Sequence, residues 1–444
     1  MSRIEDTDIL IIGAGAAGLA AAAELTAHGR HVMLVEARER AGGRIFTDTK
    51  TFAPLPIELG AEFIHGESQA ILGRLEAAKD VAIDASRERW TTRGTRLVRA
   101  DARLCALKRA FRQMSPPERD LPFAEFLDRH RRAVSPAVRE LACMIVEGFD
   151  AADPARISAR EVLEEWSGPA AVDGPTFRPA AGYDNLLQSI RLGLPTERAA
   201  LHFGTAVRRV AWGKSGIAVE ALRHGESVRL RAARAIITVP LGVLQLPATA
   251  SNSICFTPEL DAKRKTFAHL ATGPVIKVVM RFARPFWAEL HGHRYRKAAF
   301  FFAPKAQFPT FWTTLPLRTS LLVAWCAGPR AARLAGRSDG EILVSIHDSL
   351  RAVFGRLRFS AMLEYVRWHD WQSDPFACGA YSYLLAGGAG ARRALARPLD
   401  GTLYFAGEAC DTDGEAATVG GALQSGMRAA RQVLAASAAT RVAG

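Results

Sequence analysis

The sequence has few cysteines, and no two of them stand close together. The six cysteines are at positions 105, 143, 255, 326, 378 and 410, without a C-x-x-C pair. The pattern therefore predicts neither a structural zinc site nor a redox dithiol, and we expect no metal. Isolated thiols are typical of a reducing compartment, so we expect a cytoplasmic protein.

Long apolar segments are also missing. The most apolar run, Ile9–Ala23, has 15 residues and is too short to cross a bilayer. Glu5, Asp6 and Asp8 precede it where a secretory signal would carry positive charge. We therefore expect no membrane segment and no targeting signal.

Lysine is scarce although the chain is strongly basic. Only nine of the 58 basic residues are Lys, and against 45 acidic residues they give a net charge of +13. Such a charge can indicate a nucleic-acid or membrane partner. The arginines form only short clusters, such as Arg129–Arg132, so a solvated surface is the preferred interpretation and no nucleic-acid partner is expected.

The first part of the chain predicts one βαβ unit. The length of 444 residues suggests two or three domains, and we find no internal repeat or low-complexity linker. The expected elements are a buried strand at Thr7–Ile12, a turn at Gly13–Gly18, a helix at Ala16–His28 and a strand at His31–Glu36. A unit of this kind predicts a parallel, doubly wound sheet.

The rest of the chain predicts a large insertion into that sheet. Residues 76–170 carry charged and apolar residues at helical spacing and predict a helical insertion. A helix is expected from Gly420 to about Ala436. Strands are expected at His202–Val210, Ile217–Ala221, Val228–Ala232, Ala235–Val239, Val275–Phe282, Leu321–Cys326 and Gly401–Ala406.

A G-x-G-x-x-G sequence joins the first strand to the first helix. Gly13 permits a tight turn, Gly15 lets the backbone approach a pyrophosphate, and Gly18 lets helix and strand pack closely. The helix N-terminus supplies amide donors for phosphate. Glu36 stands 18 residues beyond the last glycine, where it can accept hydrogen bonds from a ribose diol. This context favours a dinucleotide site over a simple packing turn.

The residues after Glu36 favour FAD over a nicotinamide. The segment Arg38–Arg44 ends in Gly-Gly-Arg, a second phosphate contact for which a nicotinamide dehydrogenase has no need. An extended FAD needs a cation at its pyrophosphate. At this point the chain resembles the flavin amine oxidase family, which contains monoamine oxidases, polyamine oxidases and lysine-specific histone demethylases.

The resemblance extends in order over nearly the whole chain. The further matching segments are Glu58–Gly66, Thr238–Leu244, Gly273–Lys277, Asp374–Phe376 with Trp371, Gly379–Tyr383, Phe405–Glu408 and Ala417–Ala422. The resemblance implies an α/β fold class, with a Rossmann-like doubly wound FAD-binding domain and an inserted substrate domain of mixed sheet and helices. We expect the FAD-binding domain at residues 1–75, 196–270 and 390–444, and the substrate-binding domain at 76–195 and 271–389.

The resemblance also implies which residues contact the cofactor. Ala380 directly precedes Tyr381, where monoamine oxidases carry a flavin-linked cysteine nearby, and Cys378 is not expected to reach the flavin. We therefore expect non-covalent FAD. The implied FAD contacts are Gly13, Gly15, Ala16, Ala17, Gly18, Glu36, Ala37, Arg38, Gly43, Arg44, Gly60, Ala61, Glu62, Phe63, Val207, Pro240, Trp371, Gly407, Glu408, Thr418 and Val419.

Lys277 is the most unusual residue of the candidate catalytic set. It stands in the apolar run Val275–Met280, where a buried ammonium is costly without a partner. One interpretation is an edge-strand lysine that faces water. The resemblance instead implies the family's lysine that holds a water near the flavin N5 and assists the reaction with oxygen.

Five further residues are implied around the flavin ring and the substrate. Trp371 and Tyr381 would otherwise be ordinary core aromatics, but the resemblance places Trp371 against the flavin and Tyr381 on the substrate side. The second position of the family's aromatic cage falls at Thr418, so half of the cage is missing. His65, otherwise a structural histidine, is implied to contact substrate, and Phe63 stands where L-amino-acid oxidases carry a Met-Arg pair.

The implied reaction is the oxidation of a neutral amine. A hydride leaves the α-carbon for flavin N5, the resulting imine is hydrolysed to an aldehyde, and O2 is reduced to H2O2. The substrate would be a primary or secondary amine or a polyamine, handled by a monomer or homodimer. Asp411, Asp413 and Glu415 form either a solvated loop or an acidic entrance for a cationic amine.

Three alternatives stay open. An L-amino-acid oxidase is one, although Phe63 favours an amine without a carboxylate. A desaturase or porphyrinogen-type oxidase is the second, and it is not expected to share Lys277 or Gly379–Tyr383. A basic flavoprotein that binds a macromolecular partner is the third.

Overall fold

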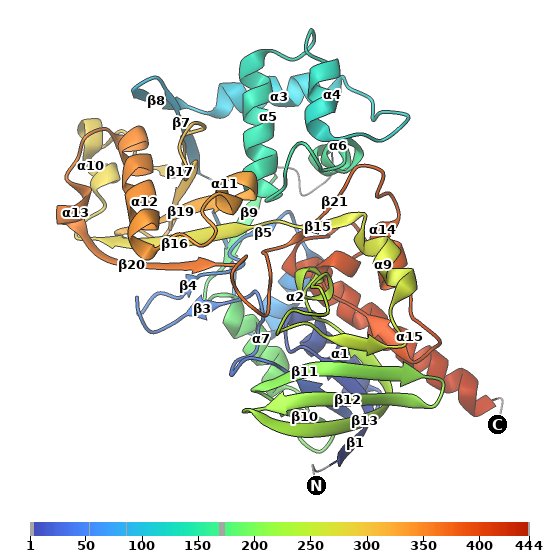
Figure 1. Ribbon diagram of the computed structural model, residues 1–444. Helices are drawn as coiled ribbons and strands as arrows, with labels where there is room; N and C mark the ends of the chain where they lie inside the picture. The colour runs from blue at the N-terminus through green and yellow to red at the C-terminus, as the bar shows by residue number, and fades with distance from the viewer. Residues whose placement is uncertain (1–3, 53, 86, 168–173, 443–444) are drawn as a thin grey trace.

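The computed structural model describes residues 4–52, 54–85, 87–167 and 174–442. Figure 1 shows one large sheet with its helices in the lower half of the molecule, and a second sheet and two groups of helices in the upper half. None of the helices in the described ranges combines the length and the apolar content that a membrane span requires.

The lower sheet is built around strand β1 (Ile4–Ile12). It lies between β2 (Val32–Val35) and β13 (Glu226–Ile237), and both pairings are parallel. The described part of this sheet has eight strands in the order β10-β2-β1-β13-β12-β11-β14, with β22 also paired to β13. The other strands are β10 (Ala199–His202), β11 (Thr205–Gly213), β12 (Gly216–Arg223), β14 (Cys255–Thr257) and β22 (Leu403–Phe405).

Helices α1 (Ala16–Ala27) and α15 (Val419–Val442) pack together on this sheet. Their close approach depends on a glycine, because a Cβ added to Gly426 would lie 2.2 Å from the carbonyl oxygen of Ala17. The same core contains α7 (Tyr183–Leu192), which the sequence-based division put with the substrate-binding part. Helix α2 (Gln69–Ala77) lies beside α15.

The upper sheet is mixed and holds the strand of Lys277. The described part has seven strands in the order β20-β16-β19-β18-β17-β7-β8, so β16 (Val275–Phe282) is not an edge strand. The water-facing alternative for Lys277 is therefore wrong. The neighbouring strands are β20 (Leu363–Asp370), β19 (Leu321–Ala327), β18 (Thr310–Thr313), β17 (Ala298–Phe302), β7 (Glu88–Arg93) and β8 (Arg96–Arg99).

The expected helical insertion at residues 76–170 is only partly present. Residues 101–167 form α3 (Asp101–Arg112), α4 (Phe123–Arg129), α5 (Pro136–Phe149) and α6 (Ala159–Ser167), which share one apolar core. Residues 82–99 form β6 (Ala82–Asp84) and the β7–β8 hairpin instead, and residues 168–170 lie outside the described ranges. Trp90 and Leu97 bury one face of that hairpin, and Gly94 turns it with a φ of +61°.

Two other sequence predictions differ from the structure. The strands expected at Val228–Ala232 and Ala235–Val239 are one continuous strand, β13. The strand expected at His202–Val210 is two strands, β10 and β11, which run in the same direction. They are separated at Gly204, which has a φ of +59°. The prediction for Val275–Phe282 is confirmed to the residue.

The remaining elements are short or cover the upper sheet. Helices α10 (Phe286–His293), α11 (Gly328–Ala332), α12 (Asp339–Phe354) and α13 (Phe359–Met362) lie at the upper sheet. The others are β3 (Thr47–Asp48), β4 (Ile57–Glu58), β5 (Ile64–His65), β9 (Thr176–Pro179), β15 (Leu270–Thr272), β21 (Ser382–Leu384), α8 (Leu241–Leu244), α9 (Asp261–Phe267), α14 (Ala391–Ala396) and the 3-10 turn Glu408–Cys410.

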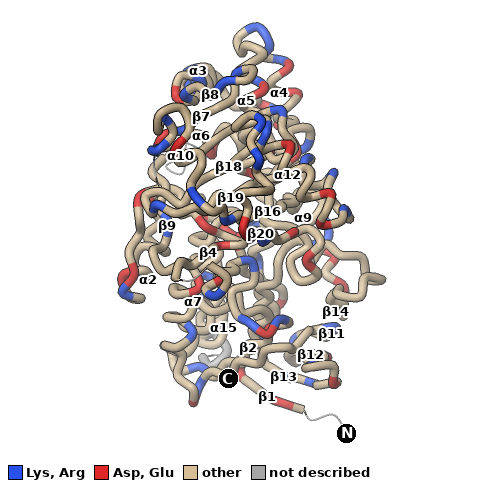
Figure 2. The backbone as a smooth tube through the Cα atoms, turned by 90° about the vertical axis from the view of Figure 1, so that its left-hand side faces the viewer, with Lys and Arg blue, Asp and Glu red and all other residues tan. Residues whose placement is uncertain are grey.

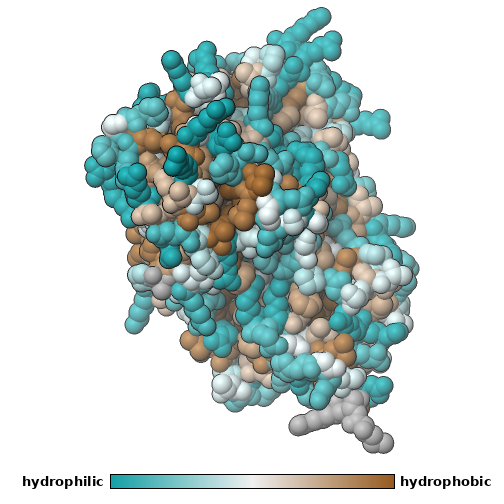
Figure 3. All heavy atoms as spheres, turned by 60° about the vertical axis from the view of Figure 1, so that its left-hand side comes forward, coloured by the Kyte–Doolittle hydropathy of each residue, from teal (hydrophilic) through white to brown (hydrophobic). Residues whose placement is uncertain are grey.

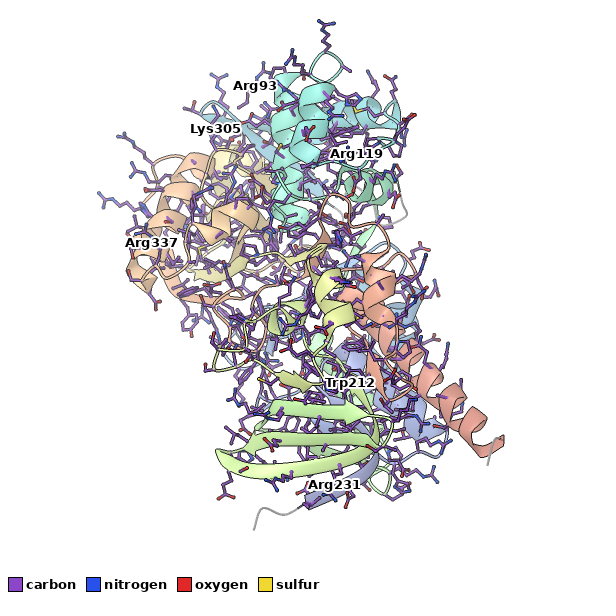
Figure 4. The ribbon with its side chains drawn as sticks, turned by 45° about the vertical axis from the view of Figure 1, so that its right-hand side comes forward. Arg93, Arg119, Trp212, Arg231, Lys305 and Arg337 are labelled. Atoms are coloured by element: carbon purple, nitrogen blue, oxygen red, sulfur yellow. The ribbon has the colours of Figure 1, made fainter. Side chains whose placement is uncertain are left out.

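The charged residues are mixed over the surface. Figure 2 shows basic and acidic positions interspersed along the whole chain trace. The labelled residues Arg93, Arg119, Arg231, Lys305 and Arg337 are spread from the top of the molecule to its base, although Arg93 and Lys305 lie near each other (Figure 4). On the face in Figure 3, apolar patches are separated by hydrophilic side chains. The net charge of +13 is therefore distributed rather than gathered in one block.

Candidate active site

One cavity of about 890 Å³ connects the two halves of the molecule. It begins at the carboxyl ends of β1 and β2, where ligands bind in doubly wound sheets, and continues between β16, β5 and the helices α5 and α6. Both the implied cofactor residues and the implied catalytic residues line it. The cavity is therefore the candidate site.

The glycines form the cradle at the lower end of the cavity. Gly13 has a φ of +110°, and a Cβ on Gly18 would lie 2.0 Å from the carbonyl oxygen of Gly13. Gly15 begins α1 without any side-chain cap, and Ala16 and Ala17 line the cavity. Amides of an uncapped first turn are donors for a phosphate, so this end fits the pyrophosphate of a dinucleotide.

Glu36 holds the turn in shape as well as facing the cavity. Its Oε2 accepts a hydrogen bond from the amide of Ala14 at 2.9 Å, and its Oε1 accepts one from the amide of Arg38 at 2.9 Å. Burial raises the pKa of Glu36, and the two amides oppose that rise. Each carboxylate oxygen keeps a second lone pair, so the predicted bonds from a ribose diol fit this geometry.

The two predicted cation residues are already tied to the protein. Arg38 donates from Nη2 to Asp374 Oδ1 at 2.5 Å. Arg44 donates from Nη1 to Glu408 Oε1 at 2.8 Å and to the carbonyl of Ala380. These contacts hold both guanidinium groups at the cavity wall. Because a guanidinium has five donors, each residue keeps donors for a phosphate.

Of the predicted cofactor contacts, only Gly18 does not line the cavity. Gly18 acts through packing, as its closeness to Gly13 shows. The residues that do line it are Gly13, Gly15, Ala16, Ala17, Glu36, Ala37, Arg38, Gly43, Arg44, Gly60, Ala61, Glu62, Phe63, Val207, Pro240, Trp371, Gly407, Glu408, Thr418 and Val419.

Lys277 reaches the cavity as a buried, paired ammonium. It is 1% exposed, and its Nζ lies 2.6 Å from Glu62 Oε2 and 3.1 Å from the carbonyl of Gly60. Glu62 also receives hydrogen bonds from Arg178 at 2.8 Å and from Trp312 at 3.0 Å. Burial raises the pKa of Glu62, but the two cations outweigh it and hold that pKa below its usual value.

Trp371 is fixed against the turn after β4. Its indole Nε1 donates to the carbonyl of Leu59 at 3.0 Å, and a Cβ on Gly60 would lie 3.1 Å from the indole ring. The ring is 4.2 Å from that of His369, which in turn binds Asp374 at 3.0 Å. Trp371 thus presents a rigid apolar wall to the cavity, and its place beside the cofactor stays a prediction.

Tyr381 and His65 meet at the last residue of α5. The hydroxyl of Tyr381 donates to the carbonyl of Phe149 at 2.5 Å, and the ring of Phe149 contacts that of His65 at 4.8 Å. Burial lowers the pKa of His65 to about 4, and the charge of Arg89 adds to that effect. His65 is therefore a neutral ring at pH 7, and Tyr381 presents its ring rather than a free hydroxyl.

Phe63 and Thr418 have structural contacts that the sequence did not indicate. Phe63 packs under the guanidinium of Arg178 at 4.5 Å and against Trp312 at 5.5 Å. The hydroxyl of Thr418 donates to the backbone carbonyl of Glu415 and accepts from the amide of Gly421, so it caps α15. Both residues line the cavity, but neither offers an unused polar group to a substrate.

The three acids of the loop before α15 do not converge on one point. Asp411 is buried and accepts the amides of Asp413 and Glu415, while Glu415 accepts the hydroxyl of Ser68 at 2.6 Å. Asp413 is exposed and does not line the cavity. The acidic-entrance hypothesis therefore receives no support from this geometry.

Sequence reasoning missed several residues that line or shape the cavity. Arg178 and Trp312 hold Glu62, Arg89 stands beside His65, and Asp150 and Glu165 come from the helical region. The one available signal was Asp150, an acid that directly follows the apolar face of α5.

The comparison with known proteins identifies the family. The sequence profile described as "Flavin containing amine oxidoreductase" matches residues 16–434. The chain belongs to this family. The match confirms the predicted family and its flavin cofactor, FAD.

Curated relatives in the family are similar over nearly the whole chain. Lysine-specific histone demethylase 1 homolog 1 of Oryza sativa subsp. japonica is 27% identical over 462 residues, which cover 96% of this chain and 52% of that protein. Polyamine oxidase 4 of the same species is 27% identical over 455 residues, which cover 95% and 87%. The chain spans about half the length of the demethylases that it matches.

Solved structures share the fold. Putrescine oxidase bound to putrescine has a TM-score of 0.80 at 21% identity, covering 98% of this chain and 100% of that one. Cyclohexylamine oxidase from Brevibacterium oxydans IH-35A has a TM-score of 0.77 at 22% identity, covering 96% and 98%. The predicted α/β fold class is confirmed.

Proposed function

We propose that the protein is an FAD-dependent amine oxidase that converts a primary or secondary amine or a polyamine to an imine, then an aldehyde, with O2 reduced to H2O2. One observation carries the proposal: a buried lysine, Lys277, lines the same cavity as the glycine cradle and the rings of Trp371 and Tyr381. The names of the polyamine, putrescine and cyclohexylamine oxidases support it.

The cofactor would be held without a covalent bond. The glycine cradle and Glu36 fit its nucleotide end, and Arg44, Gly60 and Trp371 fit its other end. Cys378 does not line the cavity, and its sulfur is turned toward Asn252 and Pro375. When bound, FAD supplies the acceptor for the hydride of the amine α-carbon and transfers electrons to oxygen.

The chain itself prepares the substrate. The rings of Tyr381, Phe149 and Trp371 make an apolar wall that disfavours the ammonium form of the reacting amine, so its nitrogen lone pair stays available. His65 is neutral and adds no positive charge there. Lys277, held at 2.6 Å by Glu62, is the residue that we propose to hold a water for the reaction with oxygen.

The function is tested by the purified protein itself. We expect a bound flavin spectrum and release of peroxide with members of a panel of alkyl monoamines, diamines and amino acids. A colourless protein that cannot be reconstituted with FAD would overturn the proposal. Stoichiometric aldehyde formation distinguishes amine oxidation from a desaturase or porphyrinogen-type reaction.

A substrate with a carboxylate is the second candidate, on the basis of Arg89. This half-buried arginine lines the cavity beside His65, and no ion pair to it is recorded among the described residues. It could therefore bind the carboxylate of an amino acid, which Phe63 cannot. If the amino acids in the panel react faster than the amines, and Arg89→Met abolishes that preference, the second candidate replaces the first.

A further inference from the structure

Two carboxyl groups from the helical region stand together in the cavity wall. Asp150 caps the C-terminal end of α5, and Glu165 lies on the last turn of α6. Both line the cavity, and their side chains are hydrogen-bonded to each other. These helices are the upper right group in Figure 1.

Among the described residues the pair has no ion-pair partner, although the charge of Arg392, which binds Glu161, opposes the rise in the pKa of Glu165. Asp150 is 8% exposed, and its Oδ2 is buried without any hydrogen-bond partner. No Lys, Arg or His among the described residues forms an ion pair with Asp150 or Glu165. Burial raises the pKa of Glu165 to about 7, and burial together with the charge of Glu165 raises that of Asp150 well above its usual value.

Other carboxylates of the cavity are satisfied by the protein. Glu62 binds Lys277 and Arg178, and Glu408 binds Arg44. Glu161, next to the pair on α6, binds Arg392 at 2.7 Å and the amide of Leu384 at 2.6 Å. Asp411 Oδ1 also lacks a hydrogen-bond partner, but it lies in the loop before α15 rather than in the helical region. Among the carboxyl groups next to Phe149 and Tyr381, the Asp150–Glu165 pair is therefore the one with an unused, buried acceptor.

The carboxyl pair lies next to the residues that are predicted to contact the reacting end of a substrate. Asp150 directly follows Phe149, whose carbonyl accepts the hydroxyl of Tyr381 and whose ring contacts His65. The C-terminal end of α5 carries the negative pole of that helix, which further favours a cation at Asp150. The pair and the predicted substrate residues therefore belong to one continuous wall.

The chemistry favours an organic ammonium over a metal ion. No group of three or more His, Cys, Asp or Glu residues suited to a metal was found in the described ranges. An ammonium has three N–H donors, enough to satisfy Asp150 Oδ2 and the carboxyl of Glu165 together. A charged donor to a carboxylate gives a stronger hydrogen bond than a neutral donor.

We propose that Asp150 and Glu165 bind the second, non-reacting ammonium of a diamine or polyamine whose other amine is oxidised beside Tyr381. This inference rests on the proposed function, and it narrows the substrate to aliphatic amines with two or more nitrogens. Asp150 and Glu165 are specificity-determining residues, separate from the residues of the oxidation.

The test compares 1,4-diaminobutane with butylamine, which lacks only the second nitrogen. In Asp150→Asn and Glu165→Gln we expect kcat/KM for the diamine to fall on the order of 30- to 100-fold, as for the loss of a charged hydrogen bond. The value for butylamine should change little. Glu140→Gln, an exposed acid on the same helix, is the matched control and should leave both values unchanged.

The wild-type protein provides a second test that needs no variant. Across α,ω-diamines of three to eight carbons we expect kcat/KM to pass through a maximum at the length that spans both sites. Matched monoamines should show no such maximum. This arm decides the question if a variant fails to fold, as judged by its flavin spectrum.

The outcomes separate the inference from the proposed function. Two results would overturn the inference while amine oxidation stands: equal losses of kcat/KM for diamine and monoamine in the variants, or no preference of the wild type for diamines. Either result would mean that the two carboxyl groups only share a proton with each other. A protein that oxidises no amine would instead overturn the proposed function.

Discussion

The ammonium of Lys277 lies 2.6 Å from the carboxylate of Glu62 in the wall of the cavity. Lys277 comes from the middle of β16, while Glu62 comes from the loop between β4 and β5. Arg178 shares the same carboxylate. One carboxylate therefore balances two buried or largely buried cations, and we expect the folded structure around the cavity to depend on it.

Replacing Glu62 tests this dependence. Glu62→Gln leaves Lys277 and Arg178 close together without a counter-charge, so we expect the free energy of unfolding to fall by about 3–5 kcal/mol. Urea denaturation followed by tryptophan fluorescence measures it. Glu364→Gln is the control, because it breaks an exposed pair with Arg281 in the same sheet and should cost less than about 1 kcal/mol. Equal small losses in both variants would contradict the prediction.

Replacing Lys277 separates its chemical role from its structural one. Lys277→Met keeps the apolar stem but removes the charge, so we expect kcat/KM for O2 to fall on the order of 10- to 100-fold. The value for the amine should change little, because Lys277 is not proposed to touch the amine. Steady-state kinetics at varied oxygen and varied amine concentrations separate the two, and an equal fall in both would argue against an oxygen-specific role.

Gly18 provides a test of the nucleotide cradle. In Gly18→Ala the added Cβ would lie 2.0 Å from the carbonyl oxygen of Gly13, so the turn or α1 must move. We expect FAD affinity to fall by at least about tenfold, because phosphate binding at a helix N-terminus requires that turn. Titration of flavin-depleted protein with FAD measures the affinity.

Gly73 is the matched control for this variant. It lies within α2, and a Cβ there would meet no atom within 4 Å. Gly73→Ala should leave FAD affinity unchanged and stabilise the protein by about 0.5–1 kcal/mol through helix propensity. If Gly18→Ala binds FAD as the wild type does, the cradle is not where the cofactor binds.

The nucleotide end of the cavity was predictable because its signal is local. Gly13, Gly15, Gly18 and Glu36 lie within one βαβ unit, and each has a role that its residue type alone can fill. Lys277 was noticeable because a charge in an apolar run needs a reason. Its partner Glu62 was assigned only to the flavin, because nothing in the sequence pairs a loop residue with a strand 215 positions away.

The substrate end was not predictable because it is assembled from distant segments. Asp150 and Glu165 come together because α5 and α6 share one apolar core, and Arg178 reaches Glu62 from β9. The β7–β8 hairpin was missed for a related reason. Its sequence is rich in Arg, and Trp90 and Leu97 are the only apolar residues that it buries, with Thr91 as a buried polar one.

His65 makes the stability of the protein depend on pH. Burial lowers its pKa to about 4 in the folded protein, whereas an unfolded histidine titrates near about 6.5. Between these values the unfolded chain binds more protons, so stability is complete above about pH 6.5 and is lost as the pH falls toward 4. At pH 5 this group alone should cost roughly 2 kcal/mol relative to pH 7.5.

His65→Gln removes that titration while keeping a neutral polar side chain. We expect the variant to lose less stability between pH 7.5 and pH 5 than the wild type, by roughly 2 kcal/mol. Urea denaturation at the two pH values measures the difference. His31→Gln replaces an exposed histidine and should follow the wild type. If His65→Gln also follows the wild type, then His65 is solvated and free to ionise, and it cannot be the neutral wall of an amine site.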